Sequence, residues 1–235
     1  MLPGVTAGEG LEVDANVVLG YPPPHGTALQ RTGCEGLLLG ARARIRSGSV
    51  LYLGSDIGAG FQTGHNVILR EGCTIGDYVA VWSNSVVDYG CWIGDRVKIH
   101  SNCYVAQFTH IGSDAFLAPG VTVANDLYPG QAASARVMSG PFIGAGAQIG
   151  VNVTILPYVR IGPGCLIGAG AVVARDIPGG TVAYGNPATV RGRVCDLPAI
   201  ESRIAAVPTS ASRYRFSAET TDTSRTPGRN DDVPG

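Results

Sequence analysis

The chain has 235 residues and a formal net charge of −1, and only 15% of its residues are charged. This near-neutral balance gives no electrostatic reason to expect nucleic acid or an anionic membrane as a partner. No apolar run is long enough for a transmembrane helix, and the N-terminus lacks the basic start and apolar core of a signal peptide. Six cysteines without such a signal predict free thiols in a reducing compartment, and therefore a cytoplasmic location.

Aliphatic residues recur at every sixth position over most of the chain. From Leu39 to Val123 the step of six meets aliphatic residues at every position except Thr63, and a second run extends from Ile143 to Val173. The pair Leu/Ile-Gly returns every 18 residues between positions 39 and 112. A coil of three short strands explains both periods, with one aliphatic side chain pointing inward per strand. The glycine then fits a corner that needs positive φ or close approach.

The residue two positions before most of these aliphatics is small or β-branched, as a second inward position on a strand requires. These residues are Ala43, Ser49, Ser55, Val67, Cys73, Val79, Ser85, Cys91, Val97, Cys103, Thr109, Ala115, Val121, Ala147, Val153, Val159, Cys165 and Ala171. Stacked coils would bury a continuous core that no single repeat could bury alone. The four cysteines in this slot are therefore expected to act as small apolar fillers.

This pattern resembles the left-handed β-helix of hexapeptide-repeat acyltransferases. The resemblance covers residues 11–192 and implies an all-β fold of about seven to eight coils, and the left hand follows from the resemblance alone. Residues 1–10 are expected to form an N-terminal extension and residues 193–207 a C-terminal extension, helical over 197–207. Residues 208–235 are rich in Ser, Thr, Arg, Asp, Pro and Gly, which predicts a disordered tail.

Two segments interrupt the repeat, one from Gly20 to about Gly36 and one from Asn125 to Pro141. Insertions in solenoids usually lie on one face and often carry function. Residues 175–188 resemble the segment that follows the last coil in acyltransferase β-helices.

Stacking of residues 18 apart makes columns on neighbouring coils. Asn66, Asn84 and Asn102 form one column, for which a ladder of side-chain hydrogen bonds is expected at the first two. Two further columns are Trp82–His100 and Trp92–His110, which could pack between subunits. The zinc carbonic anhydrases of this fold need three histidine ligands, and no close histidine pair occurs here, so we expect no metal.

Three stretches, residues 61–71, 99–105 and 116–129, resemble the nucleotide-sugar N-acetyltransferases of bacterial polysaccharide and deoxysugar pathways. That resemblance implies acetyl-CoA as donor and an amine on a nucleotide-linked sugar as acceptor. It also implies a homotrimer with the active site between subunits, and it matches Asn102 to a residue that orients the acceptor. Some relatives have Gln where this chain has His100.

A second branch, the galactoside- and maltose-type O-acetyltransferases, carries a catalytic His before Pro in the central loop, where this chain has Tyr128-Pro129. His100 is therefore the best available base, and we expect it to accept the proton while Asn102 orients the acceptor. The alternative for His100 is a surface or interface histidine packed on Trp82. A backbone N–H near Gly144 is expected to hold the oxyanion.

The family binds CoA along the late coils. The expected contacts are Gly144, Gly162, Gly168, Arg175, Asn186 and Arg191. Phosphate pairing is the functional interpretation of the arginines, and ordinary solvated side chains are the alternative.

Acceptor contacts are expected from the family-like stretches and from the second interruption. They are His65, Arg70, Glu71, Asn125, Asp126 and Tyr128. Exposed solenoid charges are the alternative for Arg70 and Glu71, and turn chemistry is the alternative for Asn125 and Asp126.

Three functions follow from the sequence. The first is acyl-CoA-dependent N-acyl transfer to an amino sugar or similar amine. The second is O-acyl transfer to a sugar or natural-product hydroxyl, and the third is a trimeric β-helix scaffold without catalysis.

Overall fold

The computed structural model describes residues 2–23 and 36–198. Residues 1–196 form one compact unit, to which the description below applies, and the second unit comprises residues 197–235. The first interruption between 24 and 35, the helix expected at 197–207 (apart from its first two residues) and the tail expected at 208–235 lie outside the described residues. Within these limits no helix is both long enough and apolar enough to cross a membrane.

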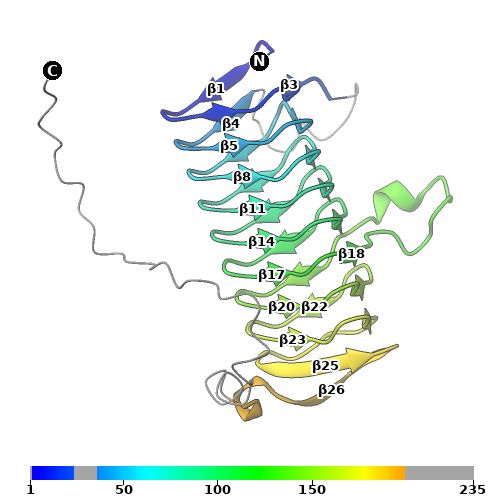
Figure 1. Ribbon diagram of the computed structural model, residues 1–235. Helices are drawn as coiled ribbons and strands as arrows, with labels where there is room; N and C mark the ends of the chain where they lie inside the picture. The colour runs from blue at the N-terminus through cyan, green and yellow to red at the C-terminus, as the bar shows by residue number, and fades with distance from the viewer. Residues whose placement is uncertain (1, 24–35, 199–235) are drawn as a thin grey trace, which may run out of the picture. The chain divides into compact units, whose positions relative to one another are not determined.

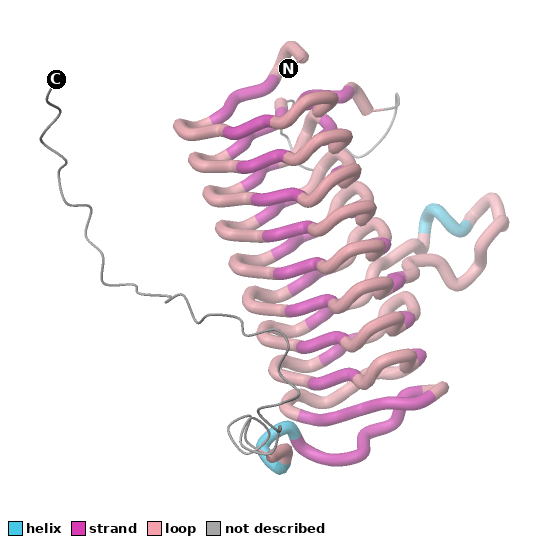
Figure 2. The backbone as a smooth tube through the Cα atoms, in the orientation of Figure 1, coloured by secondary structure: helices cyan, strands magenta, loops and turns pink. Residues whose placement is uncertain are grey.

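Very short strands stack into three parallel sheets, and each turn of the chain adds one strand to every sheet (Figures 1 and 2). The first sheet contains β1 (Val5–Ala7), β4 (Leu37–Leu39), β7 (Asp56–Ile57), β10 (Thr74–Ile75), β13 (Trp92–Ile93), β16 (His110–Ile111), β19 (Phe142–Ile143) and β22 (Arg160–Ile161). The second contains β2 (Glu12–Val13), β5 (Arg44–Ile45), β8 (Gln62–Thr63), β11 (Ala80–Val81), β14 (Lys98–Ile99), β17 (Phe116–Leu117), β20 (Gln148–Ile149), β23 (Leu166–Ile167), β25 (Thr181–Gly185) and β26 (Ala188–Arg193). The third contains β3 (Val18–Tyr21), β6 (Val50–Tyr52), β9 (Ile68–Leu69), β12 (Val86–Val87), β15 (Tyr104–Val105), β18 (Thr122–Val123), β21 (Thr154–Ile155) and β24 (Val172–Val173).

The register confirms the 18-residue period. Trp92 pairs with Thr74 on one side and with His110 on the other. Across the second interruption His110 pairs with Phe142, and across the first Val5 pairs with Leu37. Both steps are 32 residues instead of 18, so each interruption adds 14 residues to one coil without breaking the stack.

The core lies along the axis between the sheets, as the repeat predicts. Every aliphatic residue of the two runs is buried, and so is every small or β-branched residue two positions earlier. One coil exchanges the two sizes, because Phe61 occupies the small slot and Thr63 the aliphatic one, and both are buried. The hydroxyl oxygen of Thr63 accepts the hydrogen bond of the Arg46 N–H at 2.9 Å.

Close approach of neighbouring coils explains the glycine after each inward aliphatic. A Cβ on Gly94 would meet the backbone nitrogen of Ser113 at 2.6 Å. The positive φ of this corner falls two residues later, on Arg96 at 57°. The Asn column has the same cause, since Asn66, Asn84 and Asn102 all have φ of 57–61°, a conformation that Asn tolerates better than most residues. The expected ladder forms between Asn66 Nδ2 and Asn84 Oδ1 at 3.3 Å.

Both ends of the β-helix differ from the expected boundaries. Val5–Ala7 pairs with β4, so the first coil begins before residue 11, inside the segment expected to be an extension. At the other end β25 and β26 form an antiparallel hairpin that continues the second sheet, with a cis peptide bond between Asn186 and Pro187 at its turn. A 3-10 turn at Val194–Asp196 follows it.

Candidate active site

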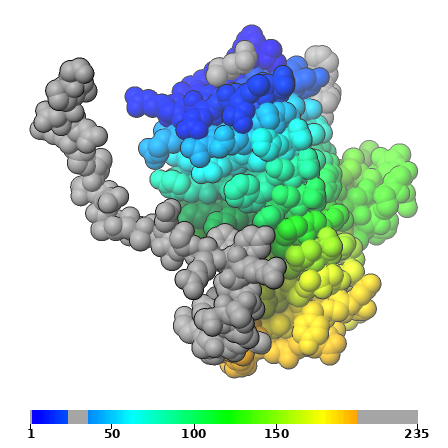
Figure 3. Space-filling view, viewed as in Figure 1, coloured from blue at the N-terminus to red at the C-terminus, as the bar shows by residue number. Residues whose placement is uncertain are grey.

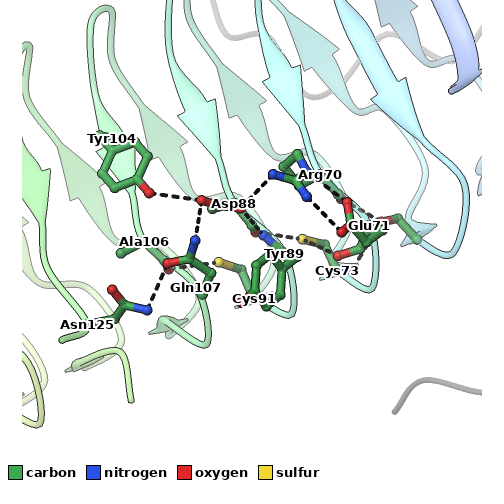
Figure 4. Close-up of polar contacts among 11 residues, drawn as sticks. Arg70, Glu71, Cys73, Asp88, Tyr89, Cys91, Tyr104, Ala106, Gln107 and Asn125 are labelled. Atoms are coloured by element: carbon green, nitrogen blue, oxygen red, sulfur yellow. Dashed lines mark hydrogen bonds and ion pairs between the residues drawn. The ribbon is translucent and has the colours of Figure 1, made fainter. Parts of the chain in front are cut away.

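Three edges, where the chain turns from one sheet to the next, carry most of the polar side chains. We call them edge 1–2, edge 2–3 and edge 3–1 after the sheets that they join. Arg70, Glu71 and Asn125, which the sequence assigned to the acceptor, lie together on edge 3–1 (Figure 4). His65, His100 and Asn102 lie on edge 2–3.

A buried carboxylate and a clamped guanidinium form the first part of the edge 3–1 cluster. Both oxygens of Glu71, which is 0% exposed, accept hydrogen bonds from Arg70 Nε and Nη2 at 2.8 Å each. The guanidinium also lies over the rings of Tyr52 and Tyr89, at 5.1 and 5.6 Å from their centroids. The hydrogen bond with Glu71 raises the pKa of Arg70, so this charge is permanent. The bidentate geometry fixes the orientation of both groups.

Asp88 is the hub of the cluster. Its Oδ2 accepts hydrogen bonds from the Tyr104 hydroxyl at 2.9 Å and from Gln107 Nε2 at 2.5 Å. Its Oδ1 accepts the Tyr89 N–H at 2.8 Å and lies 3.5 Å from Arg70 Nη1. Three hydrogen bonds and one ion pair thus hold this carboxylate. Asp88 therefore positions its neighbours.

Tyr104 stays protonated at neutral pH. Burial and the hydrogen bond to the Asp88 carboxylate together raise its pKa to about 12. Its ring lies on the outer face of the third sheet and is 37% exposed. The hydroxyl thus donates to Asp88, and its oxygen lies beside the Gln107 amide, whose hydrogen bond partly offsets the rise in the pKa.

Asn125 ties the second interruption to this cluster. Its side-chain Nδ2 donates to Gln107 Oε1 at 2.8 Å and approaches Met138 Sδ at 3.4 Å. Its backbone carbonyl accepts the Ser139 N–H at 2.9 Å. The segment between Asn125 and Ser139, which contains a 3-10 turn η1 at Ser134–Arg136, projects from the stack of coils (Figures 1 and 3). The cluster therefore closes the base of a protruding loop.

The loop residues expected at the acceptor have separate roles. Asp126 Oδ1 accepts the Tyr128 N–H at 2.7 Å, which is the turn chemistry that was the alternative interpretation. Tyr128 and its neighbour Leu127 are half exposed. The loop therefore presents apolar surface to the outside.

His100 lies on the edge that carries His65 and not with Arg70, Glu71 and Asn125, the acceptor residues of edge 3–1. It stands on edge 2–3, and β15 separates it from Gln107 on edge 3–1. Its Nδ1 accepts the N–H of Ser101 at 2.9 Å, and its ring lies 6.3 Å from Trp82 in a tilted arrangement. Next to it Asn102 is exposed, and its side-chain amide makes no hydrogen bond with any residue that the structure describes. His65, further along this edge, contacts Ser47 Oγ through Nδ1 at 2.8 Å.

The three glycines expected to bind the donor all have their N–H groups engaged. Gly144 donates to Ile161 O, Gly162 to Ile177 O and Gly168 to Ala183 O, each at 2.8 Å. Their lack of a side chain serves close approach, since a Cβ on Gly144 would meet the Pro163 nitrogen at 2.5 Å. The N–H of Gly144 itself is already used between coils, so the oxyanion donor expected near Gly144 stays a prediction for another N–H of that turn.

The remaining expected donor contacts lie at the C-terminal end of the β-helix. Arg175 follows β24 and is exposed, Asn186 lies in the hairpin turn, and Arg191 in β26 lies 5.5 Å from the ring of Tyr184. Gly162 lines a hollow of about 390 Å³ together with Arg160. Gly144 belongs to an earlier coil and does not line this hollow.

His110 belongs to an aromatic ladder on the outer face of the first sheet. Its ring stacks on Trp92 at 4.1 Å and on Phe142 at 4.5 Å, within one chain. Arg160 covers the other face of Phe142 at 4.7 Å. Burial, with a smaller contribution from the charge of Arg160, lowers the pKa of His110.

This lowered pKa predicts a pH-dependent stability. A histidine whose pKa is lower in the folded state stabilises the fold fully above its unfolded pKa of about 6.5, and loses that contribution as the pH falls toward the folded pKa. His110→Phe keeps the stack without the titration. In urea unfolding between pH 7.5 and pH 5.5, we expect the wild type to lose stability relative to His110→Phe. If the free energy of unfolding changed with pH equally in the two proteins, the lowered pKa of His110 would be contradicted.

The repeat that builds these coils matches a known protein family. The model of the bacterial transferase hexapeptide family, which consists of six repeats, matches residues 54–88, 90–125 and 140–175, and it is interrupted where the loop projects. The chain belongs to the hexapeptide-repeat acyltransferases. Its fold is accordingly the left-handed parallel β-helix of that family, which confirms the predicted fold class. No curated protein sequence matches at a significant level.

Solved structures of hexapeptide-repeat acyltransferases give distant likenesses. PerB from Caulobacter crescentus, solved with CoA and GDP-perosamine, is 27% identical over 60% of this chain and 58% of its own, with a TM-score of 0.30. The acetyltransferase domain of PglB from Neisseria gonorrhoeae is 18% identical over 80% and 57%, with a TM-score of 0.36. UDP-N-acetylglucosamine O-acyltransferase from Moraxella catarrhalis is 16% identical over 89% and 79%, with a TM-score of 0.38. The family assignment rests on the repeat.

Three residues of this acyltransferase's edge 3–1 cluster were missed by sequence reasoning: Asp88, Tyr104 and Gln107. The 18-residue column contains the signal, because Asp88 follows Arg70 by one coil and Gln107 precedes Asn125 by one coil. Tyr104 has no such signal, since it reaches Asp88 from the face of the neighbouring strand. In residues 2–23 and 36–198, no three His, Cys, Asp or Glu side chains gather as a metal site would require.

Proposed function

We propose that this acyltransferase transfers an acyl group, in the first place acetyl, from acyl-CoA to an amine on a nucleotide-linked or related amino sugar. The amine nitrogen attacks the thioester carbonyl directly, an amide forms, and CoA leaves as the thiol. Family membership supports acyl transfer, and the edge 3–1 cluster supports an amine as the acceptor.

The charge of the cluster carries this proposal. Glu71 and Asp88 bring two negative charges and Arg70 one positive charge, so the cluster has a net charge of −1 at neutral pH. A site of this sign attracts a protonated amine and repels an anionic group. Asn125 Oδ1 has no hydrogen-bond partner among the described residues, and the Tyr104 oxygen can accept a further bond. These two acceptors suit the N–H and O–H groups of an amino sugar.

A homotrimer is part of the proposal, because one chain does not bring the site together. At the strand spacing of about 3.3 Å per residue, His100 and Gln107 lie on the order of 20 Å apart along the chain. His100 and Asn102 of one copy can meet the cluster of another only across an interface. The outer face of the third sheet supplies a suitable surface, with Val50, Ile68 and Val86 in a row.

The donor is assigned to the late coils. Arg175 and Arg191 are free to pair with CoA phosphates, and the hollow beside Gly162 and Arg160 offers a further cation. We propose that the thioester end of the donor points toward the middle coils, which carry His100 and the loop.

The test is an acceptor panel with acetyl-CoA, followed by free thiol release and by mass spectrometry of the product. Nucleotide-linked amino sugars are compared with the same sugars bearing a hydroxyl in place of the amine. We expect acetylation of the amine only. Transfer to the hydroxyl alone would replace the proposal by O-acylation, and no acetyl-CoA binding at millimolar concentration in calorimetry would replace it by a scaffold.

Tyr104→Phe tests the location of the acceptor. Loss of the hydroxyl removes a hydrogen bond at the cluster, worth about a factor of ten in kcat/KM for the acceptor, while KM for acetyl-CoA should stay unchanged. Tyr158→Phe is the matched control, because Tyr158 is exposed elsewhere on the β-helix and makes no side-chain hydrogen bond within the described residues. Equal effects of the two substitutions would move the acceptor away from edge 3–1.

A further inference from the structure

The protonation state of His100 is fixed by its own backbone. A backbone N–H can only donate, so the 2.9 Å hydrogen bond from Ser101 to His100 Nδ1 requires Nδ1 to be unprotonated. The neutral imidazole must then carry its proton on Nε2. For Nε2 to accept a proton from a substrate in this conformation, Nδ1 would need to be protonated first, and two donors would then face each other.

The sequence of edge 2–3 explains why this hydrogen bond exists. At several corners a side chain from the following coil caps the N–H of the corner residue, as Ser83 Oγ caps His65 at 3.0 Å. On edge 1–2 Ser113 Oγ caps Asp95 at 3.1 Å in the same way. The residue that would cap Ser101 is Pro119, which has no side-chain oxygen. The ring of His100 accepts the Ser101 N–H in its place.

The other ring nitrogen is left for a ligand. Among the described residues Nε2 makes no hydrogen bond, and the imidazole stands between the rings of Trp82 at 6.3 Å and Phe116 at 6.4 Å. We infer that His100 acts as a neutral hydrogen-bond donor, through Nε2–H, to the thioester carbonyl oxygen, and not as the base. This inference rests on the proposed function, and it supplies an oxyanion donor other than the N–H expected near Gly144.

The chemistry balances without a protein base. The lone pair of the neutral amine forms the C–N bond, and the carbonyl electrons move to the oxygen, where Nε2–H donates to the oxyanion. When the carbonyl reforms, the C–S bond breaks and the sulfur leaves with its electron pair. The proton released by the amine nitrogen goes to that sulfur, so the products are the amide and the CoA thiol.

The first test reads the ring directly and needs no substrate. In long-range ¹H–¹⁵N correlation spectra of the ¹⁵N-histidine-labelled protein, the His100 signals, assigned by their loss in His100→Gln, should show the Nε2–H form alone. Ser101→Pro removes the donor, and Pro119 shows that the same corner of the next coil accommodates proline. In this variant we expect both tautomers to appear. A protonated Nδ1 in the wild-type protein would overturn the inference.

The second test separates donor from base. His100→Gln keeps an N–H donor but has no basic nitrogen, and His100→Phe removes both. We expect His100→Phe to lower kcat about 100-fold and His100→Gln to stay within about tenfold of the wild type. Equal losses in the two variants, or a raised kcat in Ser101→Pro, would overturn the donor role. If no acceptor is acetylated at all, the proposed function fails, while the spectra still report the tautomer.

Discussion

Replacing Arg70 by methionine is expected to lower the free energy of unfolding by about 3 kcal/mol. The substitution leaves the Glu71 carboxylate, which is 0% exposed, without the two 2.8 Å hydrogen bonds that balance its burial. Methionine approximates the length of the arginine stem, so the loss reports the broken ion pair and not a cavity. Urea unfolding monitored by circular dichroism would measure it.

Two controls identify the cause of that loss. Arg70→Met combined with Glu71→Met removes both charges, and should recover most of the stability, because a buried ion pair is often no better than apolar residues of similar volume. Arg96→Met breaks the pair with Asp114, in which both side chains are 54% exposed and screened by solvent, and should cost far less stability than Arg70→Met. If Arg70→Met were no more destabilising than Arg96→Met, the edge 3–1 cluster would be an ordinary surface network.

The core of the β-helix follows from the sequence because its period has one physical cause. An inward side chain every sixth residue must be apolar, since it has no route to water, and the residue two positions earlier shares the same space. Even the 14-residue interruptions keep this pattern, because the parallel register resumes on the far side of each. The boundary at Val5 was missed because a single turn before the first interruption offers too few repeats to show a period.

The site follows from the sequence only where its groups belong to one column. Arg70, Glu71 and Asn125 were singled out and do lie together, but the residues that connect them are Asp88 and Gln107. His100 was singled out by its residue type. Its tautomer depends on one hydrogen bond to Ser101, and therefore on what the next coil lacks at Pro119. A search by residue type finds His100, but it does not reveal that Pro119 lacks a side-chain oxygen to accept the Ser101 N–H.

The glycines of the late coils have a structural role that the sequence alone did not show. Gly144, Gly162 and Gly168 suggest exposed N–H groups ready for a ligand, whereas each donates to the following coil. A repeat in which coils approach at the strand spacing of about 4.8 Å uses its glycines for contact before it can use them for binding.

Replacing Phe61 by alanine is expected to destabilise the protein by about 3–5 kcal/mol. Phe61 is 0% exposed in a slot that holds small or β-branched residues in most other coils, and its ring fills the space that the small Thr63 leaves in the same coil. Removal of the ring leaves a cavity between coils that are held at a fixed spacing by their hydrogen bonds, so the core cannot collapse to fill it. Phe116→Ala is the matched control, because Phe116 lies on the outer face of the second sheet, is 36% exposed, and should cost about 1 kcal/mol or less.

Phe61→Val with Thr63→Ile restores the usual sizes, but it removes the hydroxyl that accepts the Arg46 N–H at 2.9 Å. That double variant should therefore recover only part of the loss. Full recovery would mean that the Arg46 N–H donates to the backbone carbonyl of residue 63, as the corresponding N–H of Gly64 donates to Val81 in the next coil.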